Sequence, residues 1–240
     1  MTSLSHADLL SGLEKALESY YILEGGSFQI KGQVARLREL VEKRKPKNIM
    51  EIGGNSGHSA LLFLAITPPE TKVVSFDLGE YAHVFAAKRY IDSVFPGRHT
   101  LVTGDSTFTV PNYEDQVAHR MKSASPPPLT FDFIFVDGGH QGDIPSKDLM
   151  NCFRLAADEN NVVAIDDISR DPSRQMHYTI QPTNAWSSMV ETGVVREHGY
   201  DDYFITDVVP TDCYARGMAW GSYLVGDSNT THSNTKHYIH

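Results

Sequence analysis

The chain has 240 residues, a formal net charge of −9 and 40% hydrophobic residues, which is enough for one large globular domain with a core. The acidic balance argues against a broad nucleic-acid-binding surface and against a polybasic membrane patch. Two cysteines are too few for a disulfide framework, so we expect a reducing, cytoplasmic setting. The N-terminus lacks the pattern of a signal peptide, and no apolar stretch of the sequence is long enough to span a membrane.

Two helices are predicted before the first strand. Apolar residues repeat at helical spacing from Leu10 to Tyr21, after a Ser5-x-x-Asp8 cap, and Gly25-Gly26 would end this helix. A second helix carries apolar residues from Val34 to Val41 and ends before Pro46. Together these helices predict a helical cap over about residues 1–45.

Strands and helices then alternate along the chain. The predicted strands are 48–52, 72–77, 100–103, 131–136 and 162–166, and the helices between them are 59–65, 84–94, 115–121 and 144–157. Such alternation predicts a doubly wound α/β fold with a mostly parallel sheet. After a helix at 185–191, strands at 194–197 and 218–225 predict an antiparallel edge pair, which makes seven strands. We expect one Rossmann-like domain over residues 1–226 and a flexible tail at 227–240.

Acidic residues follow two of the predicted strands. One strand runs into Asp137-Gly138-Gly139-His140, and another runs into Asp166-Asp167. Ligands of open α/β sheets bind at the carboxyl ends of the strands, so three carboxylates and one imidazole would meet there. Such a site suits a hard cation such as magnesium. The alternatives are a helix cap, a solvated turn and a surface histidine. Neighbours on an extended chain point opposite ways, so both acids of the pair bind only if a turn starts there.

A glycine-rich loop follows the first strand. The segment from Glu51 to Ser59 has the order strand, glycine turn and helix start, which is typical of nucleotide-type binding. Asp77 ends the second strand and suits a ribose diol, because a carboxylate accepts from two hydroxyls. The glycine spacing does not match a dinucleotide fingerprint, a P-loop or a hydrolase nucleophile elbow.

The spacing Glu51-x-Gly53-x-x-x-Gly57 resembles the first motif of class I methyltransferases that use S-adenosylmethionine. The resemblance spans roughly residues 32–168 and the terminal antiparallel pair. It implies that the loop wraps the amino-acid end of the cofactor, that Asp77 holds the ribose and that Gly104-Asp105-Ser106 lies by the adenine. Asp105 alternatively caps the next segment and leaves the adenine to Ser106. The implied cofactor-binding residues are Glu51, Gly53, Asn55, Gly57, Ser59, Asp77, Asp105, Ser106 and Asp137.

Other segments resemble metal-dependent O-methyltransferases. Lys31-Gly32-Gln33 before an amphipathic helix is similar to the catechol and caffeoyl-CoA type. The Asp-x-x-His and the later acidic pair resemble the macrocin and mycinamicin type of sugar O-methyltransferase. This resemblance implies that Asp137, Asp166 and Asp167 hold Mg²⁺ or another hard divalent cation, and that His140 is the general base. The chain departs from the pattern at Asp166, where those relatives commonly carry Glu.

The expected function is therefore methyl transfer from S-adenosylmethionine to a hydroxyl of a small molecule (a diol, phenol or sugar), assisted by a divalent metal. A nicotinamide-dependent oxidoreductase is opposed by the glycine spacing, and a nucleic-acid methyltransferase by the acidic charge. A non-catalytic cofactor-binding protein stays open, as does homo-oligomerisation. No nucleic-acid or membrane partner is expected. Segments 22–30 and 169–183 are the predicted lid over the acceptor.

Overall fold

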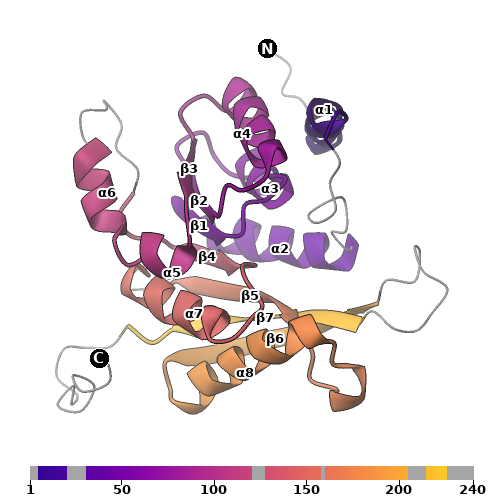
Figure 1. Cartoon of the computed structure of the whole chain (residues 1–240), viewed down its shortest axis with the longest axis vertical. Helices are drawn as coiled ribbons and strands as arrows, with labels where there is room; N and C mark the ends of the chain where they lie inside the picture. Colours follow the sequence, from indigo (N-terminus) through magenta and orange to yellow (C-terminus); the bar gives the residue numbers. More distant parts are fainter. Residues whose placement is uncertain (1–4, 21–30, 121–127, 158–159, 205–214, 226–240) are drawn as a thin grey trace.

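The computed structural model describes residues 5–20, 31–120, 128–157, 160–204 and 215–225. Within these residues one seven-stranded sheet has the order β3-β2-β1-β4-β5-β7-β6 (Figure 1). The strands are β1 (Asn48–Ile52), β2 (Lys72–Asp77), β3 (His99–Thr103), β4 (Phe133–Val136), β5 (Val162–Ile168), β6 (Val195–Phe204) and β7 (Ala215–Tyr223). Strands β1 to β5 are parallel, and β7 pairs antiparallel with both β5 and β6. The predicted α/β fold with an antiparallel edge pair is confirmed.

Helices cover both faces of this sheet (Figure 1). One face carries α1 (His6–Leu17), α2 (Lys31–Arg44), α3 (His58–Ile66) and α4 (Ala82–Val94). The other carries α5 (Ser106–Thr109), α6 (Tyr113–Arg120), α7 (Ile144–Arg154) and α8 (His177–Glu191). Each helical layer buries its apolar side against β-branched and aromatic strand residues, so the sheet lies between two cores. The ring of Phe63, for example, packs edge-on against the rings of Phe133 and Phe135.

The first helix begins as its cap predicts. Ser5 and Asp8 form a reciprocal capping box, and the buried stripe of α1 is Leu9, Leu13 and Leu17. Leu10, the first apolar residue of the predicted period, is only half-buried, because the buried stripe begins at Leu9. The predicted end at residues 25–26, the lid segment 22–30 and the tail 227–240 lie outside the described residues.

Strand β5 differs from its prediction at the acidic pair. It continues to Ile168, so both Asp166 and Asp167 lie inside the strand instead of at a turn. The pairing with β7 shifts register between Ile165 and Ile168, which marks a bulge, and Asp167 has a φ of 56°. The predicted turn is wrong; a bulge inside the strand instead breaks the alternation that would point the two neighbouring side chains to opposite faces, and both carboxylates lie near Arg216.

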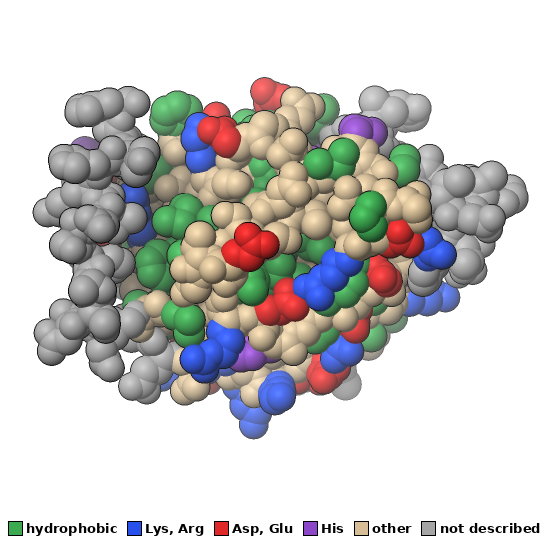
Figure 2. Space-filling view, turned by 90° about the horizontal axis from the view of Figure 1, so that it is seen from below, with side chains coloured by type: hydrophobic (Ala, Val, Ile, Leu, Met, Phe, Trp, Pro, Cys, Tyr) green, Lys and Arg blue, Asp and Glu red, His purple; other side chains and the backbone are tan. Residues whose placement is uncertain are grey.

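Two other boundaries also differ. Helix α8 begins at His177, so much of the predicted loop 169–183 is helical, preceded by the short 3₁₀ helix η1 (Pro172–Arg174). Helix α5 was not predicted, since its four residues are too few to show a period. None of the helices in the described part of the chain is both long and apolar enough to cross a membrane. The face seen in Figure 2 intersperses acidic and basic side chains with hydrophobic ones.

Candidate active site

The carboxyl ends of the parallel strands bring the glycine loop and the acidic residues to one edge of the sheet. Gly53, directly after β1, has a φ of 90°, and a Cβ atom at this position would lie 1.8 Å from the backbone oxygen of Asp137. Only glycine permits this approach, because any side chain would collide with the backbone at the end of β4. The two motifs that are 84 positions apart in the sequence are therefore in direct contact.

Asp77 holds the glycine loop in place. Its carboxylate accepts hydrogen bonds of 2.8 Å from the backbone amides of Asn55 and Gly79. Asn55 has a φ of 36°, and its side-chain oxygen lies 2.6 Å from His83 Nε2. Each carboxylate oxygen of Asp77 keeps a second lone pair, and the side chain is half-buried, so the predicted ribose contact is sterically open. The sequence did not single out His83, which lies in the first turn of α4.

Glu51 and Ser59 lie beneath the loop rather than on its surface. The Glu51 side chain is fully buried and accepts hydrogen bonds from the hydroxyls of Ser59 and Ser75. Burial raises the pKa of Glu51 to about 7, although both serine hydrogen bonds oppose this change. Ser75 also lies 2.9 Å from His99 Nε2. This buried polar network supports the loop from below.

Asp105 is a helix cap in this structure. Its carboxylate accepts from the backbone amide of Thr107 at 2.9 Å and from the Thr107 hydroxyl at 2.8 Å, which begins α5. Asp105 therefore has the role of a helix cap, which the sequence left open as the alternative to an adenine contact. Ser106 is half-buried and hydrogen-bonds Asp148, a fully buried carboxyl whose pKa burial raises to about 6.

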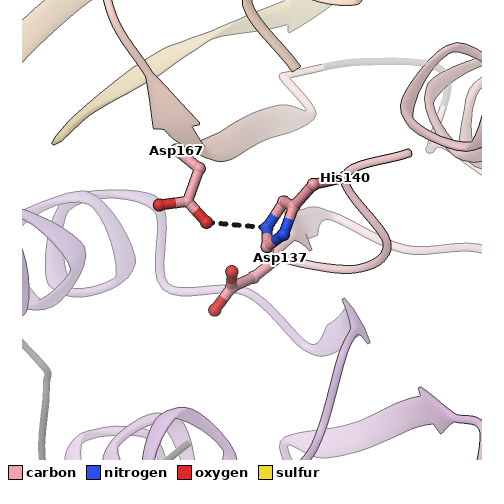
Figure 3. Close-up of side chains that lie close together, drawn as sticks. All are labelled: Asp137, His140 and Asp167. Atoms are coloured by element: carbon pink, nitrogen blue, oxygen red, sulfur yellow. Dashed lines mark ion pairs between the residues drawn. The ribbon is translucent and has the colours of Figure 1, made fainter. Parts of the chain in front are cut away.

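Asp137, His140 and Asp167 lie together at the ends of β4 and β5 (Figure 3). Each offers one ligand atom, and these atoms all lie within 4.8 Å of one another. The closest pair is His140 Nε2 and Asp167 Oδ2, at 2.7 Å. Asp167 is buried, while Asp137 and His140 are half-buried. Two carboxylates with one imidazole are suitable donors for a divalent cation.

The pKa values in this group reflect concentrated negative charge. Burial, followed by the charges of Asp166 and Asp167, raises the pKa of Asp137 well above its ordinary value. Burial alone would lower the pKa of His140, but the hydrogen bond and charge of Asp167, with the charge of Asp166, outweigh it and leave this pKa raised. A proton or another cation is therefore stabilised at this position.

Asp166 has a different environment from the other two acids. Its Oδ1 accepts from the backbone amide of Asp167 at 2.8 Å, Gln33 hydrogen-bonds its carboxylate, and its Oδ2 lies 4.0 Å from Arg216 Nη2. Burial and the charge of Asp167 raise its pKa to about 6, although Arg216 opposes this. Of the three predicted metal ligands, the structure brings Asp137 and Asp167 together with His140, and Arg216 lies beside both Asp166 and Asp167.

Three residues of the site were not found from the sequence. Arg216 comes from β7, Gln33 from α2 and Tyr178 from the first turn of α8. The Tyr178 ring lies 6.1 Å from the His140 ring, between centroids. A pocket beside His140 is lined by residues of β4, β5, α7 and α8, namely Val136, Asp137, Gly138, Gly139, His140, Pro145, Ile165, Asp166 and Pro182. No local pattern marks Arg216, Gln33 or Tyr178 as site residues, because they reach the acidic group only through the pairing of β5 with β7 and the docking of α2 and α8.

Comparison with known proteins gives consistent results. Residues 50–168, just under half of the chain, match the model of a methyltransferase domain. The structure is similar to an O-methyltransferase from Bacillus cereus in complex with SAH, with a TM-score of 0.63, 17% identity and 89% of each chain covered. It is also similar to the O-methyltransferase TomG from Streptomyces achromogenes in complex with SAM, with a TM-score of 0.66, 17% identity and 90% of each chain covered. A third similar structure is the SAH-bound methyltransferase PaMTH1 from Podospora anserina, with a TM-score of 0.61, 16% identity, 90% of this chain and 87% of that chain covered.

The matched domain begins in β1 and ends with β5, so it contains the glycine loop, Asp77, the Asp-x-x-His and the acidic pair. The likeness to the solved structures covers 89% and 90% of this chain and concerns the fold. The prediction of a methyltransferase is confirmed for the matched domain, residues 50–168, and the fold of the chain is similar to that of the solved O-methyltransferases.

Proposed function

We propose that the protein transfers the methyl group of S-adenosylmethionine to a hydroxyl of a small molecule, with His140 as the general base. The observation that carries this proposal is the 2.7 Å contact between His140 Nε2 and Asp167 Oδ2, beside Asp137 and at the same sheet edge as the glycine loop. A hydroxyl acceptor needs a base, whereas the cofactor's sulfonium methyl needs only a positioned nucleophile.

The contact with Asp167 sets the direction of proton transfer. His140 Nε2 faces Asp167 Oδ2 at 2.7 Å, so an imidazole that is neutral and protonated on Nε2 carries its lone pair on Nδ1. Nδ1 therefore takes the acceptor's hydroxyl proton, and Asp167 stabilises the imidazolium that forms. The raised pKa of His140 has the same cause and favours the protonated state that ends this step.

The acceptor oxygen then attacks the methyl carbon in line with the sulfonium. A carbon–oxygen bond forms, the carbon–sulfur bond breaks, and its electron pair stays on sulfur to give S-adenosylhomocysteine. In this scheme Asp77 holds the ribose hydroxyls while its contact with Asn55 keeps the loop closed around the amino-acid end. Asp105 remains a cap, and Ser106 is the residue closer to the adenine.

We propose a divalent cation such as Mg²⁺ at Asp137 and Asp167. Their ligand atoms lie within 4.8 Å of each other and of His140, and the carboxylates outnumber the nearby cationic side chains. Carboxylate oxygens are the donors that hard cations prefer. When bound, such a cation supplies positive charge that acidifies the acceptor hydroxyl and orients a neighbouring oxygen of a diol or phenol.

The test has two stages. First, S-adenosylhomocysteine is titrated into the protein by calorimetry; no binding at millimolar concentration would refute the proposal. Second, a panel of phenols, catechols and sugars is incubated with labelled S-adenosylmethionine, and labelled ether products are detected by mass spectrometry. Cofactor binding without turnover of any acceptor favours the alternative, a non-catalytic cofactor-binding protein.

A further inference from the structure

The buried acidic pair of β5 already has a cationic partner. Arg216 Nη1 lies 3.6 Å from Asp167 Oδ1, and Arg216 Nη2 lies 4.0 Å from Asp166 Oδ2. The Asp166 and Asp167 side chains are 2% and 5% exposed, and that of Arg216 is 19% exposed. Solvent therefore screens these charges poorly, and their interaction is stronger than that of a surface pair.

Gln33 fixes the guanidinium at this position. Its side-chain oxygen accepts from Arg216 Nη2 at 3.3 Å, and its side chain also hydrogen-bonds Asp166. Gln33 is buried in α2, so the arrangement joins the N-terminal helix layer to the terminal strand pair. The Asp166 carboxylate has contacts with Gln33, with Arg216 and with the backbone amide of Asp167. The Asp166 carboxylate therefore has partners of its own, and it does not belong to the group of ligand atoms from Asp137, His140 and Asp167 that lie within 4.8 Å of one another.

We propose that Arg216 is the resident counter-ion of both acids of the pair and competes with a cation for them, and that Asp166, which is also held by Gln33 and the backbone amide of Asp167, is not a ligand, which leaves a weak, exchangeable two-carboxylate site at Asp137 and Asp167. This inference rests on the cation in the proposed function. A hard cation takes six or more oxygen ligands, so two protein carboxylates leave most positions for water and for the acceptor's own oxygens. The fixed positive charge of Arg216 beside Asp167 also opposes a second cation by direct repulsion.

The experiment measures Mn²⁺ affinity by counting free Mn²⁺ with electron paramagnetic resonance, in the wild type and five variants. Removal of the competing charge in Arg216→Met should tighten Mn²⁺ binding by about ten-fold or more, whereas Arg216→Lys, which keeps the charge, should stay near the wild type. Asp137→Asn and Asp167→Asn should each weaken binding by about a hundred-fold.

The double variant Arg216→Met with Asp166→Asn is the matched control, because it removes one positive and one negative charge. Its Mn²⁺ affinity should lie within about three-fold of the wild type if Asp166 is not a ligand. A loss as large as that of Asp137→Asn, or no tightening in Arg216→Met, overturns the inference. Thermal melting and S-adenosylhomocysteine binding of every variant show that it is folded. If the wild type does not bind S-adenosylhomocysteine, the proposed function is refuted instead. Failure of the inference and failure of the proposed function are therefore distinguishable.

Discussion

The candidate active site, at the carboxyl ends of the strands, has two halves that are built in different ways. In the half formed by β1, β2 and β3, the glycine loop is held by Asp77, whose carboxylate accepts hydrogen bonds from the backbone amides of Asn55 and Gly79. In the half formed by β4, β5 and β7, the side chains come from distant segments and carry concentrated charge, as in the contact of Arg216 with Asp167. The first half, which we propose binds the cofactor (the cofactor half), therefore follows a local motif. The second half, which we propose binds the acceptor (the acceptor half), depends on strand pairing.

This difference predicts the largest effect for His140→Ala. Loss of the general base should reduce kcat by about 10²- to 10⁴-fold, while the affinity for S-adenosylhomocysteine stays near that of the wild type, because His140 belongs to the acceptor half. Single-turnover methyl transfer and calorimetry measure the two quantities. His198→Ala, at an exposed histidine on β6, is the control and should keep full activity. Unchanged turnover in His140→Ala would remove it as the base.

Gly53→Ala should break the contact between the two halves. Its Cβ would lie 1.8 Å from the Asp137 backbone oxygen, at a φ of 90°, so either the loop or the end of β4 must move. We expect a loss of about 3–5 kcal/mol in the free energy of unfolding, measured by urea denaturation.

The matched control for this substitution is Gly97→Ala. Gly97 has a φ of 69°, but a Cβ there would meet no atom within 4 Å. It should cost only the backbone strain, about 1–2 kcal/mol. Equal losses in both variants would show that the close approach at Gly53 has no special cost.

Asp77→Asn tests the cofactor half alone. It removes the charge that holds both the loop amides and the proposed ribose contact, so S-adenosylhomocysteine affinity should fall by about 100-fold. The control is Asp105→Asn, which keeps a good cap for α5 and should leave affinity within about three-fold of the wild type. An equal loss in Asp105→Asn would instead give Asp105 a direct cofactor role.

The smallest expected effect concerns pH and Glu51. The folded-state pKa of Glu51 is raised to about 7 from an ordinary value of 4.5, so the folded state binds the proton more tightly than the unfolded chain. The stability that this group contributes is therefore fully present below about pH 4.5 and is lost as the pH rises through about 7. The free energy of unfolding of Glu51→Gln minus that of the wild type should therefore increase by on the order of 1–3 kcal/mol from pH 5 to pH 8. Urea unfolding of both proteins at the two pH values measures this difference; a constant difference would contradict it.

The sequence by itself determined the order of the strands and helices and the cofactor half. Continuous apolar runs, glycine turns and helical periods are local signals, so β1 and β2 have the predicted bounds and Asp77 lies at the predicted strand end. The Asp-x-x-His after β4 was predicted in the same way, because an apolar strand that runs into a glycine turn places the residues of that turn at the carboxyl end of the strand.

Only the tertiary structure decided how the acceptor half is arranged. The bulge in β5 depends on its pairing with β7, and it sets the directions of the neighbouring Asp166 and Asp167 side chains, both of which lie near Arg216. The start of helix α8 is polar, and its sequence was therefore predicted to be a loop. The helix forms because Thr179 and Ala185 are buried against the sheet. Arg216 lies 49 positions after Asp167, and no periodicity connects the two. Long-range charge contacts have no signature in one sequence, because they arise from strand register and packing rather than from local spacing.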